Sequence, residues 1–422
     1  MAKTGRRRIQ EQAGGQRYLP LKEFAREALW DTVVLSGLAY MEEVLEAERT
    51  AVCGERYVHL SERVAMRSGH VPSSLTLGGR RVQVRRPRAR GADGEISLPS
   101  WREWSSRDPL GERAMEQMVV GVSTRGYRRA LEPLPGEFHV HGISKSAVSE
   151  RFVVGTANKL AALMKRKLSG LKLCAVMIDG IHFGEHMVLA AVGIEINGNK
   201  HVLGLREGAT ENATACKELL ADLIERGLPT ARALLFVIDG AKALRKAITD
   251  TFGARALIQR CREHKKRNVS ESLPERLRAQ TRNAMSQAYT TADPKRARQL
   301  LDNLARTLER DYPGAAASLR EGLDETLTIM RLEVPENLTR VLSSTNLIEN
   351  LFSRVRDMAR RVRRWQGGGM ILRWTAAGVL EAERNFRKIA GYRSLGKLET
   401  ALRAHDATFD AEHRVENRKR AA

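Results

Sequence analysis

The sequence has few aromatic side chains and no long apolar run. Phe, Trp and Tyr make up 5% of its 422 residues, which disfavours a protein that binds single-stranded nucleic acid by stacking many bases. No apolar run approaches the roughly 18 residues that a membrane-spanning helix needs, and the N-terminal residues lack the apolar stretch of a signal peptide. These absences predict a soluble, cytoplasmic protein that has no membrane partner.

Cysteine is also scarce. The four cysteines, at positions 53, 174, 216 and 261, lie far apart and form no Cys-x-x-Cys pair. Such a pattern indicates neither a disulfide framework nor a four-ligand zinc site. It is typical of a protein from a reducing compartment.

Acidic residues are too few to balance the basic ones. The chain has 72 Lys and Arg against 50 Asp and Glu, a formal net charge of 72 − 50 = +22. This charge predicts long-range attraction to polyanions, of which nucleic acid is the leading candidate. A generally basic, solvated surface is the alternative. The chain is longer than the roughly 250–300 residues that a single core covers, so we expect two or three domains.

A dense group of arginines lies between residues 80 and 98. Six arginines and no acid occur in residues 80–90, and alternating apolar residues around a turn at 89–94 predict a β-hairpin. Like charges this close repel one another unless an anion neutralises them, which favours contact with a DNA backbone. An exposed edge strand protected by its charge is the alternative. The predicted contacts are Arg80, Arg81, Arg85, Arg86 and Arg88.

Residues 112–153 have the pattern of a helix-turn-helix. A helix is predicted from Glu112 to Val120, a turn follows, and Ser144 is placed to cap a later helix. Short polar side chains near the start of a second helix suit contact with base edges in a major groove. An ordinary capped pair of helices is the alternative. The predicted DNA contacts are Ser144, Lys145, Ser146 and Ser149.

Two apolar runs of the central region are each followed by Asp-Gly. The run 173–178 leads into Asp179, and the run 233–238 leads into Asp239. Both runs are typical of buried strands, so each aspartate is expected where its strand ends. The alternative is that each Asp-Gly pair merely starts an ordinary turn.

The segments between these runs predict how the two strands pair. Strands at 187–196 and 201–205, separated by Asn-Gly-Asn, complete a meander with the first strand. An amphipathic helix over 213–228 then predicts a crossover that returns the fourth strand parallel to the first. Asp179 and Asp239 are therefore expected side by side.

Adjacent carboxylates raise one another's pKa unless a cation lies between them. Mg²⁺ prefers oxygen ligands and commonly uses one or two carboxylates, which makes Asp179 and Asp239 candidate ligands. A third acid would complete a two-metal site for phosphoryl transfer.

Glu349 is the candidate third acid. Several possible N-caps at 343–346 precede an apolar helical stripe, and Glu349 lies in the first turn, off that stripe. Arg356 and Arg360 lie on the same side and are further candidate DNA contacts. The alternative is a glutamate favoured by the positive end of the helix dipole. The spacing alone favours this alternative.

Five ordered motifs resemble the signatures of the Mutator-type bacterial insertion-sequence transposases. They are Asp179-Gly180-Ile181-His182-Phe183, Val237-Ile238-Asp239-Gly240, Cys261-Arg262-Glu263-His264, Ser344-Thr345-Asn346-Leu347-Ile348-Glu349-Asn350, and Arg373-Trp374 followed by Leu380-Glu381-Ala382-Glu383. The resemblance implies a ribonuclease H-like core with a catalytic triad at Asp179, Asp239 and Glu349. It also implies that these residues hold two Mg²⁺ ions, for which Mn²⁺ would substitute. The resemblance thus favours a catalytic role for Glu349 over the helix-dipole explanation that its spacing alone favours.

The motif Cys261-x-x-His264 is half of a zinc site, and no second pair is evident. The resemblance marks it as a family motif, and its role stays open. The basic residues Lys265 and Lys266 that follow it are predicted to lie near DNA. Helices expected at about 275–289, 294–310 and 315–330 correspond to an all-helical insertion that the resemblance implies before the glutamate.

The predicted fold is multidomain α/β, with a ribonuclease H-like mixed sheet interrupted by an all-α insertion and preceded by helical, β-hairpin and helix-turn-helix DNA-binding regions. The predicted segments are a basic arm (1–20), a helical region (21–75), the basic hairpin (76–104), a helix-turn-helix-like region (105–157), the core before the insertion (158–264), the insertion itself (265–343), the core after the insertion (344–395) and a basic helical tail (396–422).

The predicted function is that of a DNA transposase, a Mg²⁺-dependent polynucleotidyl transferase. Double-stranded DNA, as terminal inverted repeats and as target, is the expected partner of a homodimer associated with the nucleoid. One alternative is a non-catalytic repressor or architectural factor derived from a transposase, which the intact triad disfavours. Another is a ribonuclease H-type nuclease, which leaves the hairpin, the helix pair and the insertion without a role.

Overall fold

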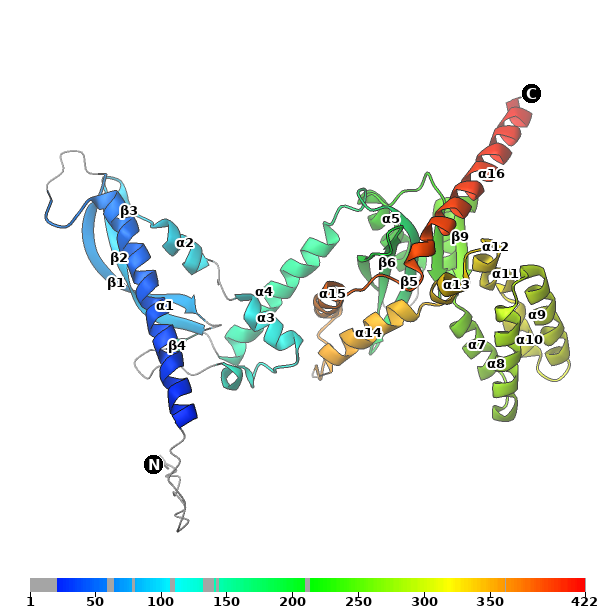
Figure 1. Cartoon of the computed structure of the whole chain (residues 1–422), viewed down its shortest axis with the longest axis horizontal. Helices are drawn as coiled ribbons and strands as arrows, with labels where there is room; N and C mark the ends of the chain where they lie inside the picture. Colours follow the sequence, from blue (N-terminus) through cyan, green and yellow to red (C-terminus); the bar gives the residue numbers. More distant parts are fainter. Residues whose placement is uncertain are drawn as a thin grey trace, which may run out of the picture. The chain divides into compact units, whose positions relative to one another are not determined.

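The computed structural model describes residues 21–58, 64–77, 80–106, 111–131, 140–141, 144–208, 213–360 and 362–421 (Figure 1). The chain divides into two compact units, the first of residues 1–117 and 124–149 and the second of residues 118–123 and 150–422. The predicted basic arm, residues 1–20, lies outside the described residues. No helix in the described ranges is long and apolar enough to cross a membrane.

The first unit is built on an antiparallel sheet with a long helix against it. Strands β1 (Met66–Leu77), β2 (Arg80–Gly91) and β3 (Gly94–Ile96) pair in this order, and β4 (Val140–His141) pairs with β2. Helix α1 (Leu21–Cys53) packs against Val82 of β2. The unit also holds α2 (Pro99–Ser106) and η1 (Tyr127–Ala130), while α3 (Gly111–Val119) and α4 (Lys145–Met164) each contribute residues to both units.

The predicted hairpin is confirmed, and a strand that the sequence does not signal precedes it. A turn at 92–93 joins β2 to β3. The helix predicted within 21–75 ends at Cys53, and the later residues of that range form most of β1. A glycine and a proline inside β1 make this strand difficult to predict from the sequence, because both residues are unusual within strands. The ladder accommodates them through a register shift just before His70, which lies opposite Pro87.

A five-stranded mixed sheet forms the centre of the second unit. Its order is β7-β6-β5-β8-β9, with β5 (Leu173–Phe183), β6 (His186–Glu195) and β7 (Lys200–Gly208) as an antiparallel meander. After α5 (Ala213–Glu225), β8 (Leu234–Ile238) returns parallel to β5. Helix α6 (Lys242–Phe252) and η2 (Gly253–Arg255) lead to β9 (Ala256–Arg260), which is parallel to β8. The predicted meander and helical crossover are confirmed.

One prediction about this sheet is wrong. Strand β5 does not end at Asp179 but continues to Phe183, because its outer residues pair with β6 as far as the turn before His186. Only the pairing of β5 with β8 stops just before Asp179, where Ile178 lies opposite Ile238. Asp179 and Asp239 therefore still follow paired positions on neighbouring parallel strands.

Helices cover both faces of the sheet, and the two faces draw on alternate residues of β5. From residue 175 onward the even-numbered apolar residues pack with α5 and α6, and the odd-numbered ones pack with α14 (Asn346–Ala359) and α15 (Gly368–Arg384). The odd-numbered residues of β8 also face α14 and α15. Since side chains alternate along a strand, Asp179 belongs to the α14 face, and Asp239 directly follows β8.

A helical insertion lies between β9 and α14, and Figure 1 shows α7 to α10 as a bundle beyond the sheet. It has a core of its own that includes Leu301, Leu308 and Leu319. The helix predicted over 315–330 is divided at Gly322, whose φ is +59°. The elements are α7 (Arg262–Glu271), α8 (Glu275–Thr290), α9 (Pro294–Glu309), α10 (Pro313–Arg320), α11 (Leu323–Thr326), α12 (Thr328–Arg331) and α13 (Glu336–Leu342).

The C-terminal region of the chain returns to the sheet. After α14 and α15, η3 (Tyr392–Ser394) leads into α16 (Leu395–Ala421), so the predicted helical tail is confirmed. The fold is mixed α/β, with helices around a five-stranded mixed sheet. The ribonuclease H-like and helix-turn-helix assignments stay predictions.

Candidate functional site

Asp179 is the one buried acid among the described residues, with 6% of its surface exposed. Its Oδ1 accepts a hydrogen bond from the N–H of Gly180 at 2.8 Å. Burial in the first place, and the nearby charge of Asp239 in the second, raise the pKa of Asp179 to about 7. A carboxyl group in these surroundings is ready to ionise when a cation approaches.

Glu349 lies in the first turn of α14, which begins after the buried N-cap residue Thr345. The apolar side chains of Ile348 and Leu351 anchor this helix on the sheet, which leaves Glu349 on the side of Asp179. Oε1 of Glu349 is buried and has no hydrogen-bond partner. A buried carboxylate oxygen in this state is unfavourable unless a cation binds it.

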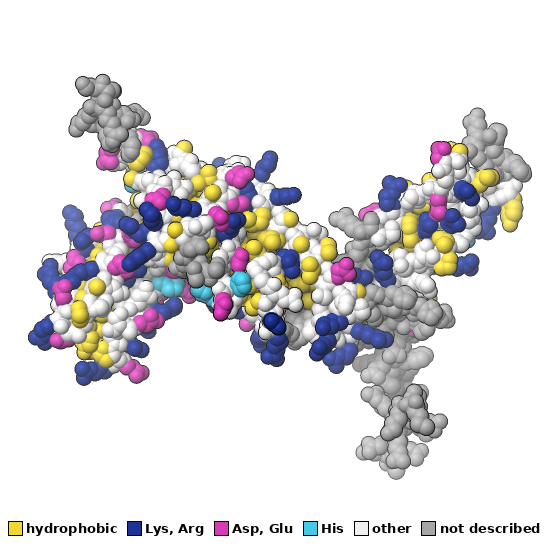
Figure 2. Space-filling view, turned by 180° about the vertical axis from the view of Figure 1, so that it is seen from behind, with side chains coloured by type: hydrophobic (Ala, Val, Ile, Leu, Met, Phe, Trp, Pro, Cys, Tyr) yellow, Lys and Arg dark blue, Asp and Glu magenta, His cyan; other side chains and the backbone are white. Residues whose placement is uncertain are grey.

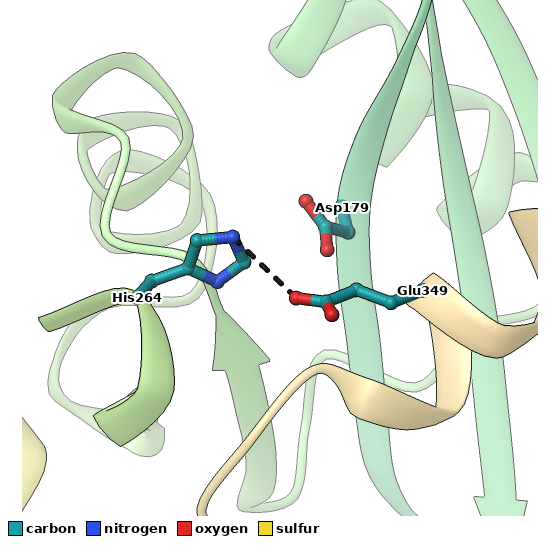
Figure 3. A group of neighbouring side chains, drawn as sticks. All are labelled: Asp179, His264 and Glu349. Carbon is teal, nitrogen blue, oxygen red and sulfur yellow. Dashed lines mark ion pairs between the residues drawn. The ribbon is translucent and has the colours of Figure 1, made fainter. Parts of the chain in front are cut away.

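His264 completes the group, and Figure 3 shows its ring close to both carboxylates. Nε2 of His264 lies 3.5 Å from Oε1 of Glu349. The hydrogen bond to Cys261 first, and then the charges of Cys261, Asp179 and Glu349, raise the pKa of His264 to about 9. The imidazole is thus a cation at neutral pH and offsets some of the negative charge around it.

The ligating atoms of Asp179, His264 and Glu349 all lie within 4.8 Å of one another. The sequence predicts Asp239 as the third member of this group. Asp239 lies outside it, but close enough for its charge to act on the pKa of Asp179. Its Oδ1 accepts the N–H of Ala241 at 2.9 Å. The structure therefore brings together the two most separated acids of the triad and adds a histidine to them.

The Cys-x-x-His spacing is explained by the start of a helix. Cys261 is the N-cap of α7, and its Sγ accepts the N–H of His264 at 3.5 Å, the three-residue step of a helix cap. The same sulfur accepts the N–H of Thr345 at 3.4 Å. Cys261 and Thr345 thus join the starts of α7 and α14, which carry His264 and Glu349.

Thr345 is a site residue that sequence reasoning treats only as one of several N-caps. Its side chain makes no capping hydrogen bond, and its Oγ1 lies 3.3 Å from Nδ1 of His264 instead. Burial acts to raise the pKa of the Cys261 thiol, but hydrogen bonds from His264 and Thr345 outweigh it and lower the pKa. No signal in the sequence separates this role of Thr345 from ordinary capping, because the partner is distant along the chain.

A divalent cation fits this group by the chemistry of its donors. The carboxylates of Asp179 and Glu349 are ligands for divalent metals, and Glu349 brings an oxygen that accepts no hydrogen bond. The imidazole of His264 becomes a ligand only when it gives up its second proton. Asp239, which directly follows β8 and whose charge acts on Asp179, can add a further carboxylate. Oxygen-rich sites of this kind hold Mg²⁺ or Mn²⁺ and suit the displacement of an oxygen at phosphorus.

The arginines of β2 divide into exposed and paired side chains. Arg81 and Arg85 are exposed, whereas Arg86 and Arg88 both form ion pairs with Glu95, at 2.7 and 2.9 Å. The hydrogen bond from Arg88 is the largest influence that lowers the pKa of Glu95. Glu95, on the neighbouring strand, is thus the anion that the arginine run itself lacks. Arg80 lies in β2, but its side chain is outside the described ones.

The other predicted DNA contacts differ in exposure. Ser144 caps α4 as predicted, since its Oγ accepts the N–H of Ala147 at 3.2 Å. Lys265 is 1% exposed, and its ammonium donates to the carbonyls of Ser318 and Glu321, so it cannot reach a phosphate in this structure. The exposed ones are Ser144, Lys145, Ser146, Ser149, Arg356 and Arg360.

Basic side chains are not confined to these elements. Figure 2 shows Lys and Arg side chains scattered over the face drawn there, among Asp and Glu. Lys266 is one that has a counterion, because its Nζ lies 2.7 Å from Oε1 of Glu263. On this face the positive charge is therefore spread out, and exposure and pairing decide which of its cations are free.

Comparison with known proteins extends over most of the chain. Residues 24–388 match the family described as "Transposase, Mutator family". The chain is 28% identical over 372 residues to the "Transposase for insertion sequence element ISRM5" of Rhizobium meliloti (strain 1021), a match that covers 85% of this chain and 89% of that protein.

Two further relatives carry similar names. One is the "Transposase for insertion sequence element IS256 in transposon Tn4001" of Staphylococcus aureus, 26% identical over 337 residues, with 76% of this chain and 82% of that protein covered. The other is the "Transposase for insertion sequence element IS1081" of Mycobacterium tuberculosis (strain ATCC 25618 / H37Rv), 26% identical over 398 residues, with 90% and 91% covered. The similarity thus includes both the sheet and the regions before it.

Proposed function

Because the chain belongs to the Mutator family of transposases, we propose that it cleaves and joins DNA at the ends of a bacterial insertion sequence by a metal-dependent Asp-Asp-Glu mechanism. Its relatives are named as transposases of insertion sequences. The observation that carries the mechanism is the approach of Asp179, His264 and Glu349 to within 4.8 Å of one another. Asp239 directly follows β8, the parallel neighbour of the strand that carries Asp179, and its carboxylate supports the same mechanism.

The proposed ligands of two Mg²⁺ or Mn²⁺ ions are Asp179, Asp239 and Glu349. Bound divalent ions would supply positive charge to the attacking and leaving oxygens of the phosphoryl transfer. The core that presents the ligands is proposed to be ribonuclease H-like. Its support is a meander followed by two parallel strands, with the two aspartates directly after the paired residues Ile178 and Ile238.

Each residue of the group has a proposed task. Asp179 holds its position through β5, where both flanking strands pair with its neighbours. Glu349 is carried by α14, and its buried Oε1 accepts no hydrogen bond, although the ring of His264 lies 3.5 Å away. His264, as an imidazolium, reduces the repulsion between these acids before DNA is bound. Cys261 and Thr345 keep the two helix starts together.

DNA binding is proposed for exposed cations and for the start of α4. Arg81 and Arg85 of β2 would contact phosphates, and Ser146 and Ser149 would contact base edges if the α3–α4 region acts as a helix-turn-helix. We expect changes at the two serines to alter the preference between terminal-repeat and random DNA. The homodimer, the eight predicted segments and the association with the nucleoid stay predictions.

Strand joining tests this function. A labelled DNA fragment that carries one inverted-repeat end is incubated with the protein and Mg²⁺, and joined products are separated by size. We expect Asp239→Asn and Glu349→Gln to abolish joining, because each removes a charged ligand, while DNA affinity stays within about threefold. Asp357→Asn, an exposed acid on the same helix as Glu349, is the matched control and should join normally.

The same assay separates the alternatives. A repressor or architectural factor would bind the inverted-repeat fragment and produce no joined DNA. A ribonuclease H-type nuclease would likewise produce no joined DNA, but it would cut an RNA–DNA hybrid. Joining at a near-native rate by Glu349→Gln in Mg²⁺ would show that the triad is assigned wrongly.

A further inference from the structure

Arg260 is a buried cation next to the loop that carries Asp239. It is the last residue of β9 and lies opposite Ile238, which directly precedes Asp239. Its side chain is 5% exposed, so it does not offer its charge to a DNA phosphate. A buried guanidinium is stable only where its neighbours satisfy it.

Two glycines with left-handed backbone lie against this side chain. Gly240 follows Asp239 and has a φ of +107°, and a Cβ at this position would collide with Nε of Arg260. Gly322 directly precedes α11 and has a φ of +59°, and a Cβ there would lie 2.7 Å from Nη1. Arg260 therefore extends from the Asp239 loop to the helical insertion, and neither end leaves room for another side chain.

The insertion holds the far end of Arg260. Nη1 donates to the main-chain oxygen of Glu321 at 3.0 Å, and Nη2 donates to its Oε2 at 3.3 Å. The ammonium of Lys265 donates to the same main-chain oxygen. Oε1 of Glu321 lies 3.5 Å from Nζ of Lys242, the first residue of α6. These contacts close a ring that passes from β9 through the insertion and back to the segment after Asp239.

A cavity and two exposed cations lie between the insertion and α6. A cavity of about 540 Å³ is lined by residues of both, Gly240, Arg245 and Glu325 among them. Arg245 does pair with Glu325, but 55% of its side chain is exposed. Exposed ion pairs contribute little to stability. Arg260 is thus a buried contact that packs against Gly240 of this loop through its Nε, which has no hydrogen-bond partner, and bonds the insertion through Nη1 and Nη2.

We propose that Arg260 is a positioning residue that latches the helical insertion to the loop of residues 239–241 and so holds Asp239 in place to bind metal. The inference rests on the proposed function of Asp239 as a metal ligand. The N–H of Ala241 donates to Oδ1 of Asp239 at 2.9 Å, so the backbone of this loop sets the direction of the carboxylate. A shift of the insertion therefore reaches the metal site through Arg260.

Hydrogen exchange in the full-length protein tests the latch directly. Arg260→Gln removes the charge and the guanidinium, and we expect the amides of residues 239–241 to exchange about tenfold faster while those of α8 and α9 keep their rates. Arg260→Lys retains the charge and should show a smaller change. Arg298→Gln, which removes an exposed ion pair with Asp324 inside the insertion, is the matched control and should leave the loop unchanged.

Binding of Mn²⁺ to the DNA-free protein is the second measurement. We expect Arg260→Gln to raise the Kd by about tenfold, the effect typical of residues that orient a metal ligand. If this variant does not fold, Gly322→Ala keeps Arg260 but crowds its Nη1, and it should produce both changes.

Unchanged exchange at 239–241 together with unchanged Mn²⁺ affinity in the folded variants would overturn the proposal. Failure of the proposed function looks different, because Asp239→Asn would then leave Mn²⁺ affinity unaltered while Arg260→Gln still accelerated exchange of the loop.

Discussion

The chain concentrates cations in two regions, and the structure treats them in opposite ways. In β2, Arg81 and Arg85 are exposed to solvent. At the end of β9 and the start of α7, the residues Arg260, Arg262 and Lys265 are only 5%, 6% and 1% exposed. Both runs look alike in the sequence, and both suggest proximity to DNA. Burial distinguishes a surface that can bind phosphate from a contact that holds two regions of the protein together.

The partners of the buried cations explain how the core accepts them. Nε of Arg262 donates to the carbonyl of Thr326 at 3.0 Å, and its guanidinium lies 4.7 Å from the ring centroid of Tyr289. The ammonium of Lys265 donates to carbonyls at the end of α10. Carbonyls at a helix end carry partial negative charge, so they satisfy a cation without a carboxylate. Arg262 and Lys265 therefore fasten α7 to the later helices of the insertion, whereas Arg260 at the end of β9 connects the sheet to it.

The largest expected effect is the loss of stability when one of these cations is truncated. Arg262→Ala removes one of the two donors to the carbonyl of Thr326, since Nε2 of Gln259 also donates to it, and takes the guanidinium away from the ring of Tyr289. We expect the free energy of unfolding to fall by about 3 kcal/mol, as for other broken buried polar contacts. Urea unfolding followed by circular dichroism measures the change.

Arg81→Ala is the matched control for this experiment. An exposed arginine without a partner in the core should change the free energy of unfolding by no more than about 0.5 kcal/mol. Equal losses in the two variants would remove the distinction between the two regions.

The sequence predicts the sheet and the acids better than it predicts these cations. The two apolar runs and the helical crossover place Asp179 and Asp239 beside each other after paired residues of adjacent parallel strands, because both signals are local in the sequence. The burial of Lys265 depends on carbonyl groups 53 and 56 residues away. No periodicity encodes such a contact. For the same reason the sequence finds Cys261 and His264 as a motif but not their connection to Thr345.

A smaller effect is expected from the pH dependence of stability at Lys265. Burial first, and then the charge of Arg260, lower the pKa of Lys265 to about 8 from its ordinary 10.5, although Glu321 and Glu325 oppose this shift. Between these two values the unfolded chain binds a proton that the folded protein lacks. The contribution of Lys265 to stability therefore rises with pH across this range, by about 1–3 kcal/mol.

Lys265→Met isolates this contribution, because methionine binds no proton in either state. Urea unfolding of both proteins at pH 7.5, 9 and 10.5 should show the difference between wild type and variant growing in favour of the wild type as pH rises. A difference that stays constant over this range would mean that Lys265 keeps its charge when buried.

The smallest expected effect concerns the exposed arginines of β2, which should matter for DNA and little for stability. The double variant Arg81→Gln, Arg85→Gln should bind every DNA sequence more weakly, and the slope of log K against log salt should flatten by about 0.9 for each lost phosphate contact. Arg86→Gln should change the slope less, since Arg86 already pairs with Glu95 at 2.7 Å. Fluorescence anisotropy with repeat and random DNA at several KCl concentrations measures the slopes of the wild type, the double variant and Arg86→Gln.

Two outcomes would contradict this prediction. If Arg86→Gln flattened the slope as much as the loss of one exposed arginine does, pairing with Glu95 would not withhold that cation from DNA. Exposure alone would then separate the two regions. If the double variant changed sequence preference and kept the wild-type slope, the exposed arginines would read bases and not phosphates.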